Sequence, residues 1–210
     1  DHRSITFRLR AQARFSNGDA VTADDVKYSF DTLRSADASP LWRQYWADVS
    51  EAVVVDARTI RFEFARLNRE LHMILGSVPV FSRKWAAGRR FDQVVHDMPV
   101  GSGPYLIESV DLGKRITYRR NPDWWGRDVP ARRGSFNFER VTYVYFLDEF
   151  ARLESFRAGS FDFIHENAAK NWARSYSGRR FDDGTLVKTE LPHSNPQGIQ
   201  GLFFNTRRPQ

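Results

Sequence analysis

The stretch from Phe15 to Phe30, FSNGDAVTADDVKYSF, decides the fold of the first part of this chain. Asn17-Gly18 predicts a tight turn, because both residues tolerate the positive φ angles that such turns need. Thr22 is a candidate helix N-cap, and Asp25 three residues later completes a pair of the capping-box type. An apolar stripe follows at helical spacing and consists of Val26, Phe30 and Leu33. We therefore predict a turn that leads into a capped helix with one buried face.

Alternating apolar residues around this stretch predict β-strands. Residues 4–11, SITFRLRA, alternate with period two, and hairpins are predicted at 51–64 and 105–121. A turn leading into a strand is predicted at 78–85, and further strands are predicted at 138–148, 160–166, 185–191 and 199–205. Helices are predicted at 68–76, 85–95, 149–159 and 167–176. Asp148 is expected to cap the third of these helices, whose apolar face would comprise Phe150, Leu153 and Phe156.

The composition excludes several classes of protein and site. No window of 18 apolar residues occurs, so we expect no membrane span. The chain contains no cysteine, which excludes disulfides, thiolate metal sites and cysteine nucleophiles. The net charge of +6 rests on 27 arginines, scattered singly or in pairs among 26 carboxylates. This distribution is typical of a solvated surface rather than of a nucleic-acid-binding patch.

Motifs that would indicate catalysis or a cofactor are weak. The sequence has no nucleophile elbow, no zinc-protease motif and no phosphate-binding loop. GSGPY at 101–105 is a poor dinucleotide loop, because Leu106 replaces the third glycine and Pro104 lacks an N–H. His165-Glu166 could form a metal or acid–base pair, but such pairs are usually solvated. Asp24-Asp25 is better explained by helix capping than by shared catalysis. We expect no catalytic residues, no metal and no cofactor.

Aromatic residues are the more informative candidates for a binding site. Trp42, Tyr45 and Trp46 cluster in a segment without a clean helical stripe. They could fill the core, or they could form a pocket wall that stacks on a ligand while one edge stays wet. Trp124-Trp125 follows a predicted turn and is expected to pin that turn against the sheet. Arginines interleaved with aromatics would also suit single-stranded nucleic acid, although no known fold pattern for such binding is present.

Three motifs in order resemble one family. Residues 7–35, FRLRAQARFSNGDAVTADDVKYSFDTLRS, resemble the signature of the family 5 extracellular solute-binding proteins, the peptide-, dipeptide- and nickel-type binding subunits of ABC importers. GSGPYLIES at 101–109 and RITYRRNPDWWG at 115–126 resemble two later motifs of the same family. The segments 161–176 and 190–209 look like the subgroup linked to oligopeptide and microcin-type peptide uptake.

The resemblance implies a mixed α/β (α+β) fold, namely part of lobe I of a type II-like periplasmic binding protein. Residues 1–99 would form its smaller subdomain, 100–205 part of the larger subdomain with a mixed sheet and helices, and 206–210 the start of the hinge. Family members are about twice this length or more and close two lobes over a ligand. The chain would then be a piece of lobe I, without leader or lobe II.

The resemblance also implies a function. The protein would capture a peptide-like solute in the periplasm and deliver it to an ABC permease in the inner membrane, without enzymatic activity and without binding nucleic acid. The residues expected to contact the ligand are Trp42, Tyr45, Trp46, Leu202, Phe203 and Asn205. A nickel chelate, an opine or a sugar remains an alternative solute on the same scaffold. A hydrolase that uses Asp or Glu and a binder of single-stranded nucleic acid are the alternatives from other classes.

Overall fold

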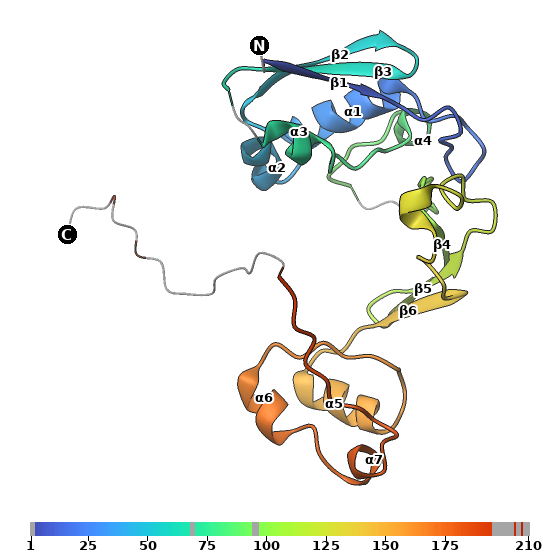
Figure 1. Ribbon diagram of the computed structural model, residues 1–210, viewed down its shortest axis with the longest axis vertical. Coiled ribbons are helices and arrows are strands. Elements are labelled where there is room, and N and C mark those ends of the chain that lie inside the picture. Colours follow the sequence, from blue (N-terminus) through green and yellow to red (C-terminus); the bar gives the residue numbers. More distant parts are fainter. Residues whose placement is uncertain (1–2, 68–69, 94–96, 195–203, 205–206, 208–210) are drawn as a thin grey trace. The chain divides into compact units, whose positions relative to one another are not determined.

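The computed structural model describes residues 3–67, 70–93, 97–194, 204 and 207 (Figure 1). The chain divides into two compact units, Asp1–Tyr145 and Phe146–Gln210. The first unit contains two three-stranded sheets, and the described part of the second contains helices. This combination confirms the predicted mixed α/β class.

The first sheet is built from the strand and the hairpin that the alternation predicts. Its strands are β1 (Ser4–Arg8), β2 (Val49–Asp56) and β3 (Thr59–Phe64), paired antiparallel in the order β1-β3-β2. The turn between β2 and β3 is closed by Asp56, whose Oδ1 accepts a hydrogen bond of 2.8 Å from the Arg58 backbone N–H.

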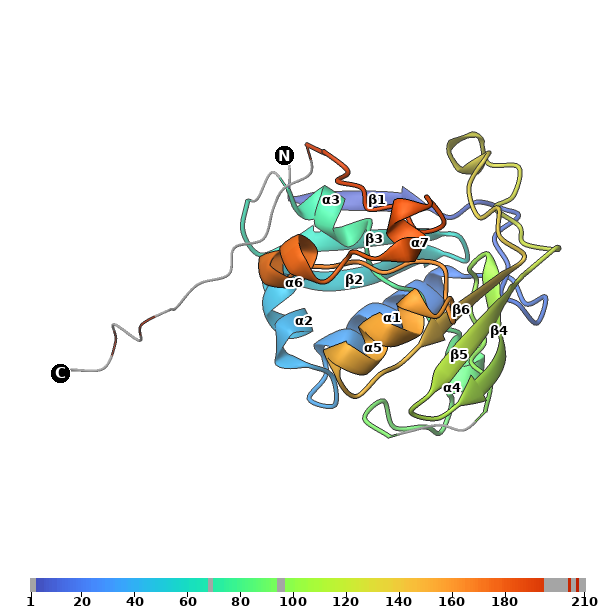
Figure 2. The ribbon, with the colours of Figure 1, turned by 90° about the horizontal axis from the view of Figure 1, so that it is seen from below.

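Helix α1 (Ala23–Arg34) covers one face of this sheet (Figures 1 and 2). The predicted stripe is confirmed, because Val26, Phe30 and Leu33 are all buried. Phe30 meets Phe62 of β3 edge to face, with ring centroids 5.2 Å apart. The core of the unit therefore lies between α1 and the sheet.

Three short helices complete this layer: α2 (Pro40–Tyr45), α3 (Leu71–Leu75) and α4 (Arg83–Ala86). The strand part of the turn and strand predicted at 78–85 is wrong. The Phe81 backbone N–H donates to Ser29 Oγ of α1 at 2.7 Å instead of to a neighbouring strand. Ser82 then caps α4, accepting from the Trp85 N–H. In the helix predicted at 85–95, residues 87–93 are not helical.

The second sheet comprises β4 (Tyr105–Asp111), β5 (Arg115–Arg120) and β6 (Arg140–Val144), antiparallel in the order β4-β5-β6. Gly113 turns the predicted hairpin with a φ of 75°. The short 3-10 helix η1 (Pro130–Arg132) lies in the connection between β5 and β6. The strand predicted at 138–148 is confirmed at its centre.

The segment from Val100 to Pro104 makes contacts on both of its sides within the first unit. The Ser16 N–H donates to the Gly101 carbonyl at 2.7 Å, and the Asn121 N–H donates to the Pro104 carbonyl at 2.8 Å. Val100 and Trp125 also pack on a small apolar cluster, which consists of Ala13, Phe15 and Val21. One sheet precedes this segment in the sequence and the other follows it, while the subdomain division at residue 100 remains a prediction.

The second unit contains α5 (Glu149–Arg157), α6 (Ala169–Arg174) and α7 (Arg179–Asp182). Asp148 caps α5 as predicted, because its Oδ1 accepts from the Ala151 N–H at 2.7 Å. The expected apolar face is only partly correct, since Phe156 is buried whereas Phe150 is 74% exposed. No helix in the part of the chain that the structure describes is long and apolar enough to cross a membrane.

The strands predicted at 160–166 and 185–191 are wrong, because neither segment forms a strand. Phe161 packs instead on the rings of Phe146 and Phe156, with centroids 5.6 and 5.4 Å apart. Phe163 and Val187 are about three-quarters exposed, so these apolar side chains of the alternating pattern are not packed against a neighbouring strand. The strand predicted at 199–205 lies outside the described residues except for Phe204, which is in coil.

Candidate ligand-binding site

The aromatic cluster predicted from the sequence lies on and just after helix α2. Ser39 caps this helix by accepting from the Leu41 N–H, and Pro40 occupies its first turn, where no N–H partner is needed. The Arg43 guanidinium donates to the Ser35 carbonyl at 3.3 Å and ties α2 to the end of α1. These contacts fix the helix that carries the aromatic side chains.

The three aromatic residues form one group. The rings of Trp42 and Trp46 stack with centroids 5.2 Å apart and planes 17° apart. Tyr45 meets Trp46 edge to face at 5.7 Å. Trp46 also contacts Phe30 of the core at 5.9 Å. Trp46 therefore connects the group to the core of the unit.

Burial separates the roles of these residues. Trp46 is 0% exposed, whereas Trp42 is 38% and Tyr45 50% exposed. The sequence left open whether the group fills the core or faces a ligand, and the structure shows one ring in the core and two at the surface. Trp42 and Tyr45 thus offer apolar faces, and Tyr45 a hydroxyl, at a surface fixed from below. Leu202, Phe203 and Asn205, the other predicted contacts, lie outside the described residues.

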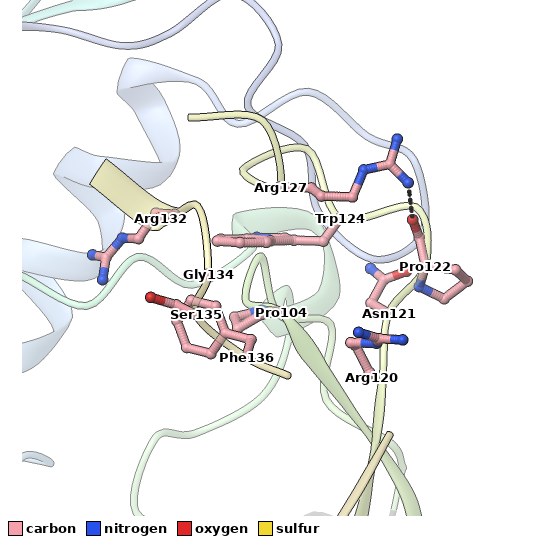
Figure 3. Close-up of a pocket in the computed structure, with 10 residues that line it drawn as sticks. All are labelled: Pro104, Arg120, Asn121, Pro122, Trp124, Arg127, Arg132, Gly134, Ser135 and Phe136. Atoms are coloured by element: carbon pink, nitrogen blue, oxygen red, sulfur yellow. Dashed lines mark hydrogen bonds between the residues drawn. The ribbon is translucent and has the colours of Figure 1, made fainter. Parts of the chain in front are cut away.

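A pocket that the sequence did not predict lies between the end of β5 and the connection to β6. Its volume is about 290 Å³ (Figure 3). Its lining residues are Pro104, Arg120, Asn121, Pro122, Trp124, Arg127, Arg132, Gly134, Ser135 and Phe136. The signal in the sequence was the run RRNPDWWG, where cationic and aromatic residues alternate with turn residues. Trp124 and Trp125 are pinned, as expected, but to the carbonyl of Ser102 rather than to the sheet.

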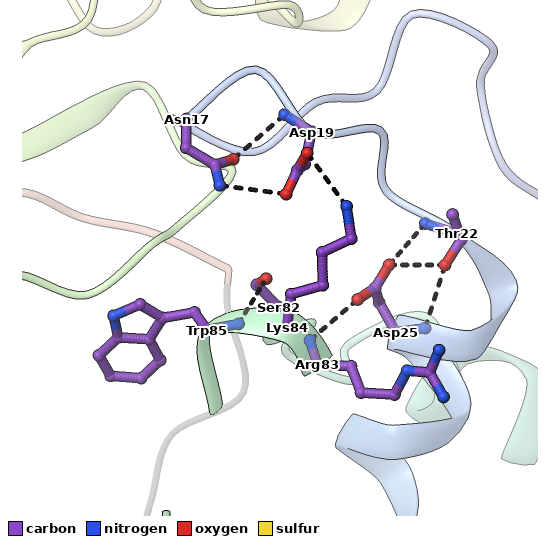
Figure 4. A network of polar contacts seen from close by, with 8 residues as sticks. All are labelled: Asn17, Asp19, Thr22, Asp25, Ser82, Arg83, Lys84 and Trp85. Carbon is purple, nitrogen blue, oxygen red and sulfur yellow. Dashed lines mark hydrogen bonds and ion pairs between the residues drawn. The ribbon is translucent and has the colours of Figure 1, made fainter. Parts of the chain in front are cut away.

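A polar network at the start of α1 proves to be scaffold (Figure 4). Asp25 Oδ2 accepts from the backbone N–H and the hydroxyl of Thr22, at 2.9 and 2.6 Å. Its Oδ1 accepts from the Arg83 N–H at 2.9 Å. Asp25 and Arg83 are 58 residues apart in the sequence. The three bonds hold the Asp25 carboxylate in place between α1 and α4. Asp24 is exposed and takes no part in these bonds, although it lines the same pocket of about 240 Å³ as Asp25.

Glu166 is the most buried carboxylate of the second unit, with its side chain 5% exposed. It accepts from the Ala168 N–H at 2.8 Å and from the Tyr176 hydroxyl at 2.7 Å, and Arg152 lies 3.5 Å away. Burial alone would raise the pKa of Glu166, but these bonds and the Arg152 charge together lower it. Burial, followed by the bond to Glu166, raises the pKa of Tyr176 to about 12. The adjacent His165 is exposed, and the described residues contain no group of three potential metal ligands.

Comparison with known proteins identifies a family and several relatives of this chain. The family described as "Bacterial extracellular solute-binding proteins, family 5 Middle" matches residues 1–210. The uncharacterized protein YejA of Escherichia coli K12 is 33% identical over 209 residues, which are 100% of this chain and 34% of that protein. A protein of Agrobacterium fabrum named "Probable peptide-binding protein YejA" is 35% identical over 218 residues, covering 99% of this chain and 35% of that protein.

Solved structures show the same fold. The binding protein AgaA of A. tumefaciens R10, in complex with agropinic acid, superposes with a TM-score of 0.66 and 26% identity. The superposition covers 82% of this chain and 34% of that protein. The chain therefore spans about a third of the length of the relatives that it matches.

Proposed function

The chain belongs to the family 5 bacterial extracellular solute-binding proteins, and from this premise we propose that it is part of the binding component of an ABC importer for a peptide-like solute. The complete protein would bind the solute outside the inner membrane and pass it to a permease. Binding would not involve chemistry on the solute. The proposal is supported by the family match along the whole chain and by the peptide-binding name of one relative.

The observation that carries the proposal is the surface formed by Trp42 and Tyr45. A ligand site needs apolar faces that stay accessible and do not rearrange, because each side chain that is ordered on binding costs about 0.5–1.5 kcal/mol. Trp46 provides that order in advance by stacking under Trp42 from the core. We assign Trp42 and Tyr45 to direct contact with the solute, and Trp46 to positioning them.

The remaining contacts would come from Leu202, Phe203 and Asn205 and from the part of the protein beyond this chain. An extended peptide can be held through its backbone by strand-like hydrogen bonds, while its side chains occupy tolerant pockets. Asn205 is suited to the backbone contacts, because its amide both donates and accepts. Closure of two lobes by a hinge would then remove the peptide from water.

An opine-type solute is the second candidate. The observation that favours it is the structure of AgaA with agropinic acid, at 26% identity to this chain. A compact polar solute would use Tyr45 as a hydrogen-bonding group more than Trp42 as a stacking surface. The two candidates therefore differ in which substitution should weaken binding more.

The experiment uses the complete gene product. Native mass spectrometry of the protein as purified identifies any bound solute, and calorimetry with a series of synthetic peptides of increasing length measures affinity. We expect Trp42→Ala and Tyr45→Ala to weaken binding about tenfold or more, which corresponds to about 1.4 kcal/mol or more. Tyr145→Ala is the matched control, because Tyr145 is 52% exposed and directly follows β6, away from α2 in the sequence.

Two results would overturn the proposal. One is peptide affinity that survives both substitutions on α2 unchanged. The other is release of a cleaved peptide during the titration, which would indicate a hydrolase. Tight binding of agropinic acid together with no binding of any peptide would instead favour the second candidate.

A further inference from the structure

The pocket shown in Figure 3, hereafter the Trp124 pocket, is lined by positive charge. Three of its ten lining residues are arginines, namely Arg120, Arg127 and Arg132, and none is acidic. Its volume of about 290 Å³ is close to the lower end of the range, about 300–1,000 Å³, that is typical of sites for small molecules. A ligand that fits here is therefore small and carries negative charge.

The wall of the Trp124 pocket is held rigidly. The Trp124 indole N–H donates to the Ser102 carbonyl at 2.9 Å, and its ring meets Phe136 edge to face with centroids 5.2 Å apart. Gly126 makes room for this ring, because a Cβ at that position would lie 2.4 Å from a Trp124 ring carbon. The ring is only partly buried, so it keeps an accessible apolar surface in the pocket.

The polar groups of the pocket divide into occupied and available ones. Arg127 donates to the Pro122 carbonyl at 3.2 Å, and Asn121 Oδ1 accepts from the Asp123 N–H at 3.1 Å. The side chains of Arg120 and Arg132, in contrast, make no hydrogen bond or ion pair with another residue that the structure describes. The Asn121 amide nitrogen likewise has no partner among the described residues. The pocket is therefore lined by three side chains whose N–H groups have no described acceptor.

The next arginine along β5 provides an internal comparison. Arg119 lies 3.8 Å from Glu108, which also accepts two bonds from Arg140. Successive residues of a strand point to opposite faces of the sheet. Arg119 thus belongs to a satisfied surface ion-pair network, whereas Arg120 is turned into the pocket without a carboxylate.

The backbone of the pocket wall is strained at one position. Phe136 has a φ of 59°, and it is the one residue other than glycine with positive φ in the described ranges. Such a conformation is unfavourable for residues other than glycine and is concentrated at functional sites. Here it places the Phe136 ring against Trp124 at the pocket's edge.

We propose that the Trp124 pocket is a second binding site, specific for a small organic anion with a carboxylate on a planar apolar body. Arg120 presents a planar fork that matches a carboxylate, and the neighbouring Asn121 amide adds one donor. The planar body stacks on Trp124. Arg132 and Ser135, seen toward the left end of the Trp124 ring in Figure 3, contribute positive charge and a hydroxyl.

This site is separate from the one proposed on α2, because none of its lining residues belongs to that helix. The two proposals can therefore fail independently. Trp42→Ala should leave the Trp124 pocket unaffected, and substitutions in the pocket should leave peptide affinity unchanged.

The test measures binding of para-fluorobenzoate to the complete gene product by fluorine NMR, with para-fluorobenzamide as the neutral analogue. We expect saturable binding of the carboxylate and at least about tenfold weaker binding of the amide, because a hydrogen bond to a charged group contributes more than one to a neutral group. Arg120→Gln should weaken benzoate binding about tenfold. Arg115→Gln, at an exposed arginine at the start of the same strand, is the matched control and should have no effect.

A second pair of variants tests the aromatic wall. Gly126→Ala displaces the Trp124 ring and should weaken benzoate binding, whereas Gly103→Ala meets no atom within 4 Å and should not. Circular dichroism confirms that each variant is folded. The proposal is overturned if wild-type protein shows no saturable benzoate binding, or if Arg115→Gln weakens it as much as Arg120→Gln. It is also overturned if inorganic phosphate displaces benzoate at equal concentration and Gly126→Ala has no effect, because the pocket would then recognise charge alone.

Discussion

At the scale of single residues, Asp25 shows how one carboxylate joins two parts of the chain. One of its oxygens accepts from Thr22 and completes the cap of α1, and the other accepts from the Arg83 N–H at the start of α4. The spacing of Thr22 and Asp25 predicts the first function, since a capping box is a local pattern. The contact with Arg83 depends on tertiary structure, so no local pattern could have indicated it.

Removing the Thr22 side chain should destabilise the protein without affecting any binding site. We expect Thr22→Ala to lower the free energy of unfolding by about 0.5–2 kcal/mol, as for other N-caps. Thr32→Ala, in the last turn of the same helix, is the control and should be neutral or slightly stabilising, because alanine favours helix. Urea unfolding measures both. Equal effects of the two substitutions would show that the cap contributes nothing.

Glu166 predicts a specific dependence of stability on pH. Its pKa in the folded protein lies below the ordinary value of 4.5, so the folded state binds protons less readily than the unfolded state. The stability that this carboxylate contributes is present above pH 4.5 and is lost as the pH falls through the lowered pKa.

Glu166→Gln should remove this contribution, because the amide does not titrate. We expect the variant to be less stable than the wild type at pH 7, and the difference to shrink as the pH is lowered below the ordinary pKa of Glu. Asp162→Asn, at an exposed carboxylate four residues earlier, controls for the change in net charge. Thermal unfolding at a series of pH values measures the difference, and a constant gap across the series would contradict the assignment.

At the scale of elements, residues one helical turn apart on α2 and its C-cap have different roles. Trp46 stabilises the fold, whereas Trp42 is proposed to contact the solute. Trp46→Ala should cost about 3–5 kcal/mol, as is usual for a buried aromatic residue. Trp46→Phe should cost much less, because the buried Trp46 indole N–H has no partner among the described residues and burying such a group costs about 1–3 kcal/mol. Trp42→Ala should cost less than Trp46→Ala, since Trp42 is 38% exposed. Chemical unfolding of the three variants tests this order, and an equal cost for both alanine variants would contradict it.

Elements defined by local signals were the ones that the sequence could predict. The α1 cap, the hairpin turn at Gly113 and the Asp148 cap each depend on residues within four positions of one another. Residues 78–85 and 160–166 also have strand-like sequences but form no strand. In the first segment, Ser29 takes the N–H of Phe81, and in the second, Phe161 packs on Phe156. The first outcome depends on a partner 52 residues away in the sequence. In both segments, side-chain contacts that a strand pattern does not include override local propensity.

The candidate site was predictable to the same extent. Composition and resemblance singled out Trp42, Tyr45 and Trp46, but only the structure separates the buried ring from the two exposed ones. Arg120 was one arginine among 27, and nothing local distinguishes it from Arg119. The difference lies in the face of β5 on which each side chain falls and in the position of Glu108.

At the scale of the whole molecule, the chain spans about a third of the length of its relatives. The exposed aromatic residues of α2 fit one half of a binding cleft, because an exposed apolar patch is typical of a ligand-binding groove or an interaction site. The division of residues 1–205 into subdomains near residue 100, and a hinge at 206–210, stay predictions that the complete structure would test.

The last prediction follows from this view of the cleft and compares the 210-residue chain with the complete gene product. If two lobes close over the peptide, the isolated chain leaves one face of the ligand in water and lacks the polar contacts of the other lobe. Losing three or four hydrogen bonds of about 1 kcal/mol each weakens binding by about 100- to 1,000-fold, for example from micromolar to a few tenths of millimolar. Calorimetry with the same peptide on both proteins measures the difference, after circular dichroism has shown that the 210-residue chain is folded. Equal affinities would mean that these residues hold the whole site, and binding by lobe closure would have to be abandoned.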